Sequence, residues 1–214
     1  MTGLSDRDAE KERLEWEFEL LGRGAFNWIL SAMALLSAAD LTYERYTAAA
    51  QLHGALTYRD ASGVLRAVER PLSASEVDLL PETRLGPVAI MLLGLGLENL
   101  TKGLMIHASP ELVSRDRGIH QQLKSHKLED LVAACADPSH VDERRALGII
   151  SQFVNWAGRY PIPTKPVGAD QAGQNMGFWA RHQLAPIEWL WEHATAVRLR
   201  LTDKVKAEFP QAAV

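Results

Sequence analysis

The stretch that decides the fold is Pro87–His107, PVAIMLLGLGLENLTKGLMIH, an apolar run with one polar cluster formed by Glu98, Asn99 and Lys102. A run of this length and composition predicts a buried helix. Glu98 and Lys102 are one helical turn apart, so a helix places them on one face, where they can pair. A charge pair inside apolar sequence is costly unless it is satisfied or used. This helix is therefore either the core of an all-α domain with a structural ion pair or the wall of a polar site.

The bulk composition is that of an ordinary globular protein. The chain has 214 residues, of which 47% are hydrophobic and 23% are charged, with a formal net charge of −4. This length suits one domain, or one domain with an extra helical layer. The negative charge means that no global basic field indicates nucleic-acid binding, although a local basic patch remains compatible with it. A single cysteine, Cys135, excludes an internal disulfide and fits a reducing compartment.

The amino-terminal sequence MTGLSDRDAEKERLEWE is charged from its start and lacks the apolar core of a signal peptide. The longest uninterrupted apolar run, Pro87–Leu97, is too short to span a bilayer. We therefore expect a cytoplasmic protein that does not engage a membrane.

Apolar residues recur at alternating steps of four and three in the first part of the chain and predict a helix. They are Leu14, Phe18, Leu21, Ala25, Trp28, Ala32 and Leu35. Asp40 is expected to cap a second helix, so that residues 1–58 form an N-terminal helical hairpin. Residues 59–86, with several glycines, prolines and serines, are expected to be irregular, with one short helix after Ser75.

Three more helices are expected after the central one. The first runs from about Lys127 to Ala136, the second follows Ser139, and the last begins near Phe178, with Pro186 as a kink or a fresh start. Between them, residues 160–177 contain three prolines and three glycines and predict a long loop, which either crosses the mouth of a cleft or is a surface connection without a role. No segment alternates like a strand. The predicted fold is all-α, a bundle of about five to seven helices in which residues 87–205 form the main body and pack with residues 1–58 as one unit.

Three pieces in a fixed order carry a family resemblance. They are GLGLENLTKGLMI in the central helix, HKLEDL after a variable loop, and WAGRYPIP at the end of another helix. Together they resemble the HEPN superfamily of small helical proteins. The matching positions are Glu98, Lys102, His126, Leu128 and Arg159-Tyr160-Pro161, and the resemblance covers about residues 87–163.

The resemblance implies an RNA-associated protein. Many HEPN proteins are metal-independent ribonucleases of toxin–antitoxin, phage-defence or RNA-processing systems, with an active-site Arg and His contributed by two protomers. It therefore implies RNA or a nucleotide as ligand, a homodimer, and a protein partner such as an antitoxin. The family's short Arg-to-His spacing occurs here only at Arg115 and His120, in the loop before HKLEDL. A non-catalytic HEPN-like scaffold or protein-interaction module is the alternative.

On the ribonuclease hypothesis, Arg159 contacts phosphate or transition-state charge, His126 or His120 transfers protons, and Glu98 orients the arginine. Four further residues are expected to bind the ligand by charge or by stacking on a base. They are Lys102, Tyr160, Arg115 and Lys124. Structural alternatives remain open: an ion pair for Glu98 and Lys102, a helix C-cap for Arg159, a solvated connection for the basic segment, and a helix cap for His126.

No metal or cofactor is expected. No helical pair of histidines and no set of cysteines has metal-ligand spacing, and no nucleophile elbow or glycine-rich phosphate loop is present. Gly94 and Gly96 lie inside an apolar helix and indicate close helix packing instead. Trp179, Trp189 and Trp191 in the last helix predict a packed core together with a dimer interface.

Overall fold

The computed structural model describes residues 10–17, 24–59, 61–62, 64–68, 70–114, 118–136, 140–157 and 186–210. Over this part the fold is all-α, as predicted. The α-helices beyond the first short one at residues 10–17 are α2 (Ala25–Ala55), α3 (Ala74–Leu79), α4 (Leu85–Ala108), α5 (Leu128–Cys135), α6 (Val141–Gln152) and α8 (Ile187–Glu208). The 3₁₀ helices are η1 (Leu80–Arg84), η2 (Pro110–Leu112) and η3 (Gln121–Lys124), and η4 (Phe153–Ala157) is a π-helix.

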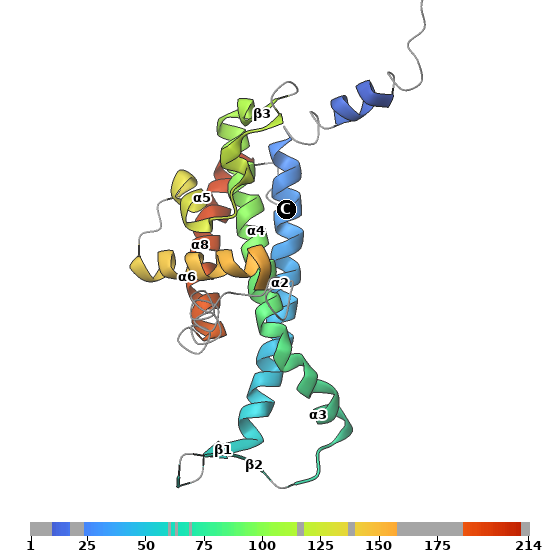
Figure 1. The fold of residues 1–214 in the computed structure, drawn as a ribbon, viewed down its shortest axis with the longest axis vertical. Coiled ribbons are helices and arrows are strands. Elements are labelled where there is room, and N and C mark those ends of the chain that lie inside the picture. The colour runs from blue at the N-terminus through green and yellow to red at the C-terminus, as the bar shows by residue number, and fades with distance from the viewer. Residues whose placement is uncertain are drawn as a thin grey trace, which may run out of the picture.

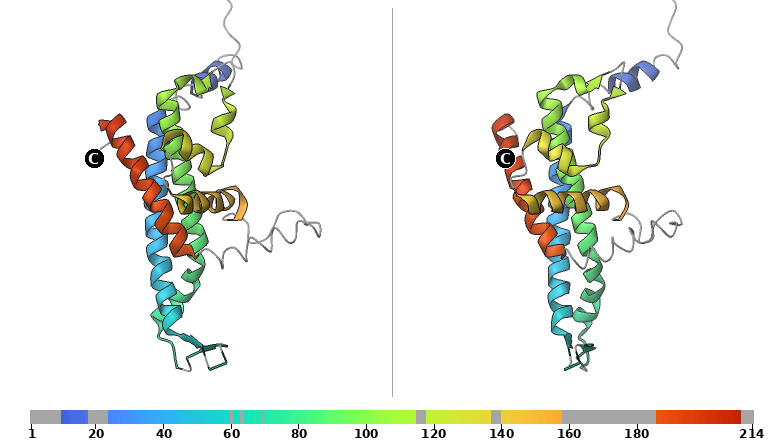
Figure 2. Two further views of the ribbon diagram at one scale, coloured as in Figure 1. Left: turned by 90° about the vertical axis from the view of Figure 1, so that its left-hand side faces the viewer. Right: turned by 60° about the vertical axis from the view of Figure 1, so that its left-hand side comes forward.

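Helix α4 is the centre of the bundle. Helix α2 lies along it as the other arm of a long hairpin, while α5, α6 and α8 pack on its remaining sides (Figure 1). Figure 2 shows that α8 (red) crosses the pair formed by α2 and α4. Apolar residues occur all round α4, as expected for a helix that is covered on every side. Its most deeply buried side chains include Ile90, Leu93, Leu97 and Leu100.

Glycines in α4 let its neighbours approach the helix backbone. A Cβ atom at Gly94 would lie 2.6 Å from side-chain atoms of Ile150 and Val154, and one at Gly96 would lie 2.7 Å from Leu36. Both distances are shorter than a carbon–carbon contact allows. The prediction that Gly94 and Gly96 serve close helix packing is confirmed.

The predicted helix break at Asp40 is wrong. Helix α2 continues from Ala25 to Ala55, and the Asp40 carboxylate accepts two hydrogen bonds from Arg198 of α8, at 2.6 and 2.9 Å. The capping signal is overridden because this tertiary ion pair uses the side chain and because the flanking alanines favour helix. The partner of α2 in a hairpin is therefore α4, and not a second helix within residues 1–58.

Other predicted helix starts lie close to those in the structure. Helix α3, expected after Ser75, begins after Ser73, whose side chain forms a capping box with Glu76. Pro186 precedes α8 and marks a fresh start. His140 stands at the N-cap of α6, whereas Ser139, the predicted cap, lies outside the described residues, as do residues 158–185 with the predicted loop and Trp179.

Two short antiparallel ribbons were not predicted. Strand β1 (Thr57–Arg59) pairs with β2 (Leu65–Ala67), and β3 (Val113–Ser114) pairs with β4 (Gly118–Ile119). Strands of two or three residues are too short to show the alternation by which a strand is detected. Both sheets in the described part of the chain are two-stranded, so neither changes the all-α class.

Two helical segments are long and apolar enough to cross a membrane by length and composition, namely α2 and residues 74–108. The apolar window of residues 74–108 is mostly buried inside the bundle, as in the core helix of a soluble protein, whereas most of the α2 window is not. Polar residues interrupt both segments, so neither stands out in the sequence as a continuous apolar run.

We expect Gly94→Ala to destabilise the protein by about 1–3 kcal/mol, because the new methyl group overpacks the contact of α4 with Ile150 and Val154. Gly148→Ala in α6 is the matched control, since the nearest atom to its Cβ would be 3.8 Å away. The control should gain up to about 1 kcal/mol from helix propensity. Thermal unfolding of both variants checks this; a Gly94→Ala protein as stable as the control contradicts the packing argument.

Candidate functional site

The polar cluster of the central helix meets a histidine from another segment. The Glu98 carboxylate accepts a hydrogen bond from Lys102 Nζ at 2.6 Å, and its two oxygens lie 3.1 and 3.0 Å from His126 Nδ1. Glu98 and Lys102 are only 5% and 3% exposed, whereas the His126 side chain is 47% exposed. The cluster therefore extends from the core of α4 to the surface through one imidazole ring.

The backbone on both sides of His126 is held in place. Ahead of it, η3 ends at Lys124, and the Ser125 hydroxyl accepts the N–H of Lys127 at 3.1 Å. Behind it, α5 begins with the fully buried Leu128, whose N–H donates to Ser151 Oγ of α6 at 2.8 Å. An orphan donor at the start of α5 is thus satisfied by a neighbouring helix, and the ring of His126 is fixed against Glu98.

The hydrogen bond assigns the tautomer of His126. An ionised carboxylate only accepts hydrogen bonds, so Nδ1 carries a hydrogen and Nε2 is the basic nitrogen of the neutral ring. A half-exposed histidine oriented by a buried carboxylate is suited to general acid–base chemistry.

Three of the eight predicted site residues therefore come together, namely Glu98, Lys102 and His126. His120 has a different contact, because its Nδ1 accepts the N–H of Gln122 at 3.3 Å and caps η3. Lys124 is exposed at the end of the same turn. Arg159, Tyr160 and Arg115 lie outside the described residues, so their predicted roles stay predictions.

A second buried carboxylate forms a tertiary ion pair that the sequence did not predict. Glu143 of α6 accepts two hydrogen bonds from Arg200 of α8, at 2.9 and 2.5 Å. These bonds hold the pKa of Glu143 below its ordinary value, although burial opposes them. Glu143 stands in the first turn of α6, where a carboxylate favours the helix dipole, and the sequence carries no local signal for a partner 57 residues away.

A pocket of about 420 Å³ lies at the carboxyl ends of α4 and α8, away from the cluster of Glu98. Its lining includes the polar side chains of His107, Ser109, Gln122, Lys204 and Glu208, together with Cys135. The Cys135 thiol donates a hydrogen bond to the Thr101 carbonyl oxygen, with Sγ 3.5 Å from that oxygen. Burial raises the pKa of this thiol. The thiol is neutral at physiological pH and is a poor nucleophile.

Within the described ranges, no three side chains of His, Cys, Asp or Glu converge as a metal site would require. Comparison of the chain with protein-family models, with curated proteins and with solved structures finds no match. The geometry of Glu98, Lys102 and His126 is therefore the basis for any functional argument.

We expect Glu98→Gln to destabilise the protein by about 3 kcal/mol, because it leaves the buried Lys102 ammonium without its counter-charge. The double variant Glu98→Gln, Lys102→Met should regain most of this loss, since it removes the uncompensated charge at similar volume. Denaturant unfolding of the two variants and the wild type measures the difference. Equal stabilities for the single and double variants contradict the assignment of the cost to Lys102.

The pair of Glu143 and Arg200 predicts a pH dependence of stability. Because the pKa of Glu143 is lowered in the folded state, its stabilisation is fully present above the unfolded value of 4.5 and is lost as pH falls below it. We expect Glu143→Gln to cost about 1 kcal/mol at pH 7 and less at pH 3. Chemical unfolding of both proteins at the two pH values tests this, and a pH-independent difference contradicts it.

Proposed function

We propose that this protein is a cytoplasmic, HEPN-like, RNA-associated protein in which His126 and Glu98 carry out metal-independent cleavage of RNA in a defence or toxin–antitoxin setting. The observation that supports this is the contact of His126 Nδ1 with both oxygens of the buried Glu98 carboxylate. This contact joins two of the three sequence pieces that resemble the HEPN superfamily, the central helix and the HKLEDL segment.

The proposed chemistry uses the 2′-hydroxyl of RNA as the nucleophile. His126 Nε2 takes the proton of that hydroxyl while its oxygen attacks the adjacent phosphorus, and the bond from phosphorus to the 5′-oxygen of the next nucleotide breaks. The leaving oxygen receives a proton from the imidazolium or from water, so the products are a 2′,3′-cyclic phosphate and a free 5′-hydroxyl. Glu98 holds the ring in the orientation and tautomer that this step needs.

We assign roles to the other site residues as follows. Lys102 is almost fully buried and donates to Glu98, so we assign it to holding the carboxylate rather than to direct contact with RNA. Lys124 is exposed two residues before His126 and is suited to a phosphate contact. Arg159 remains our candidate for the charge on phosphorus, with Tyr160 for stacking on a base and Arg115 for the RNA backbone.

A non-catalytic scaffold or protein-interaction module is the second candidate. The observation that favours it is the row of large apolar side chains exposed on α2, which include Phe26, Leu30 and Met33. Exposed apolar surface of this kind is typical of protein–protein contacts. In this reading Glu98, Lys102 and His126 only hold α5 on α4.

RNA cleavage measured with EDTA present distinguishes the two candidates. We expect His126→Ala to lower the rate by about 100-fold or more, since general acid–base catalysis contributes roughly that factor. The matched control is His53→Ala, at the exposed end of α2, which should cleave at the wild-type rate. Arg159→Ala is expected to lose activity as His126→Ala does.

Two results contradict the ribonuclease proposal. One is wild-type protein that does not cleave any of a panel of structured and unstructured RNAs, and the other is cleavage that persists unchanged in His126→Ala. The first outcome favours the scaffold candidate, and the second excludes His126 as the catalytic group.

A further inference from the structure

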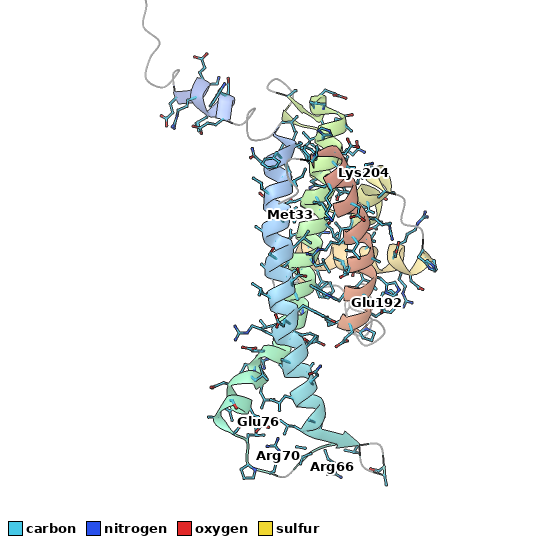
Figure 3. The ribbon with its side chains drawn as sticks, turned by 180° about the vertical axis from the view of Figure 1, so that it is seen from behind. Met33, Arg66, Arg70, Glu76, Glu192 and Lys204 are labelled. Carbon is cyan, nitrogen blue, oxygen red and sulfur yellow. The ribbon has the colours of Figure 1, made fainter. Side chains whose placement is uncertain are left out.

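The outer face of α2 carries apolar side chains that the bundle does not cover. We define this face by Phe26, Leu30, Met33, Ser37 and Leu41, at successive steps of four, three, four and four residues. The four apolar members are 40%, 52%, 43% and 65% exposed in that order. Another side of the helix packs against α4 through residues such as Ile29 and Leu36. Figure 3 labels Met33 on this helix.

The first half of this face is also free of charge. No Asp, Glu, Lys or Arg occurs from Ala25 to Ala39, although helix surfaces that face water are usually charged or polar. A partner can therefore cover the face without burying an ionised group. The spacing is that of a helix–helix seam, so the shape fits another helix.

We propose that the outer face of α2 binds the same face of a second copy of this chain, with the two helices antiparallel and the two-fold axis between Met33 and Ala34. This register places Phe26 opposite Leu41 of the partner subunit, Leu30 opposite Ser37 of the partner subunit, and Met33 opposite Ala34 of the partner subunit. Two of these three pairings set a large side chain against a small one, as close packing requires. The face is therefore complementary to itself.

The start of α2 supports the antiparallel orientation. Gly24 at the N-cap makes no side-chain hydrogen bond, and the first turn contains no acidic residue, so the positive end of the helix dipole has no negative side chain from its own first turn. In the proposed register, the exposed Glu44 faces the start of the partner's α2. Each copy then supplies the carboxylate that the other copy's first turn lacks.

Two tryptophans of the last helix make contacts within their own protomer. Trp189 and Trp191 pack against the core of their own protomer, and Trp191 stacks on Tyr43 with ring centroids 3.9 Å apart. The proposed seam of α2 spans about 22 Å from Phe26 to Leu41. A contact of this length is at the small end of stable interfaces, so we expect dissociation in the micromolar range.

Disulfide trapping tests the orientation. In a Cys135→Ser background, Ala34→Cys should form a cross-linked dimer under mild oxidation, because the two copies of residue 34 meet near the axis. Glu44→Cys is the matched control on the same face, since its two copies lie about 31 Å apart in the antiparallel dimer. Equal cross-linking at both positions indicates a parallel or unspecific contact and overturns the proposal.

Sedimentation equilibrium tests the surface itself. Leu30→Glu should raise the dimer Kd by about 100-fold or more, because it buries a charge in the seam, and should leave the thermal midpoint unchanged. Leu199→Glu is the matched control, since Leu199 is 60% exposed on α8 and should leave the Kd unchanged. A wild-type protein that stays monomeric at all concentrations overturns the proposal, as does equal dimerisation by both variants.

Two further experiments with the same protein test other occupants of this face. A double variant Leu14→Glu, Trp16→Glu should dimerise as the wild type does. Its loss of dimerisation would assign the contact between the copies to the amino-terminal helix and overturn the proposal. In flotation with phospholipid vesicles, the protein should stay with the soluble fraction. Vesicle binding that Leu30→Glu abolishes would assign the face to a membrane and overturn the proposal.

Discussion

The buried carboxylate of Glu98 is the constraint on which the described structure depends. Taking a charge out of water in the middle of an apolar helix is unfavourable by several kcal/mol unless donors surround it. Here Lys102 supplies one donor from the next turn of α4 and His126 supplies another from a separate segment. The segment that carries His126 must therefore dock on α4 in one position. The polar cluster thus specifies how α5 meets the core, in addition to any chemistry that it performs.

Around that cluster, two glycines of α4 determine how its neighbours pack, in addition to the apolar side chains of the core. Glycine at 94 and 96 lets side chains of α6 and α2 contact the backbone of α4. Ion pairs then tie the outer helices together, with α8 bonded to α2 through Asp40 and Arg198 and to α6 through Glu143 and Arg200. Apolar contacts hold the centre of the bundle, and charged contacts between helices hold its periphery.

The all-α class, the central helix and the association of Glu98 with Lys102 could be predicted from the sequence, because helical periodicity and four-residue spacing are local signals. The meeting of Glu98 with His126, 28 residues away, was suggested only by the resemblance of two short motifs. The break at Asp40 was predicted wrongly, since a local capping residue cannot be told from one that a distant arginine binds. The partners of Asp40 and Glu143 could not be predicted, because both arginines lie in the last helix, far along the chain.

The depth of Glu98 in α4 has a consequence for how the cluster can open. Its helix is covered on all sides, so amide hydrogens near Glu98 should exchange with solvent only through near-global unfolding. His126, by contrast, lies between a short 3₁₀ turn and an eight-residue helix, which can separate from the core at a smaller free-energy cost. The two halves of one hydrogen-bonded pair therefore belong to regions of different opening free energy. A partner or ligand that acts on the His126 segment could engage or release the imidazole while α4 stays folded.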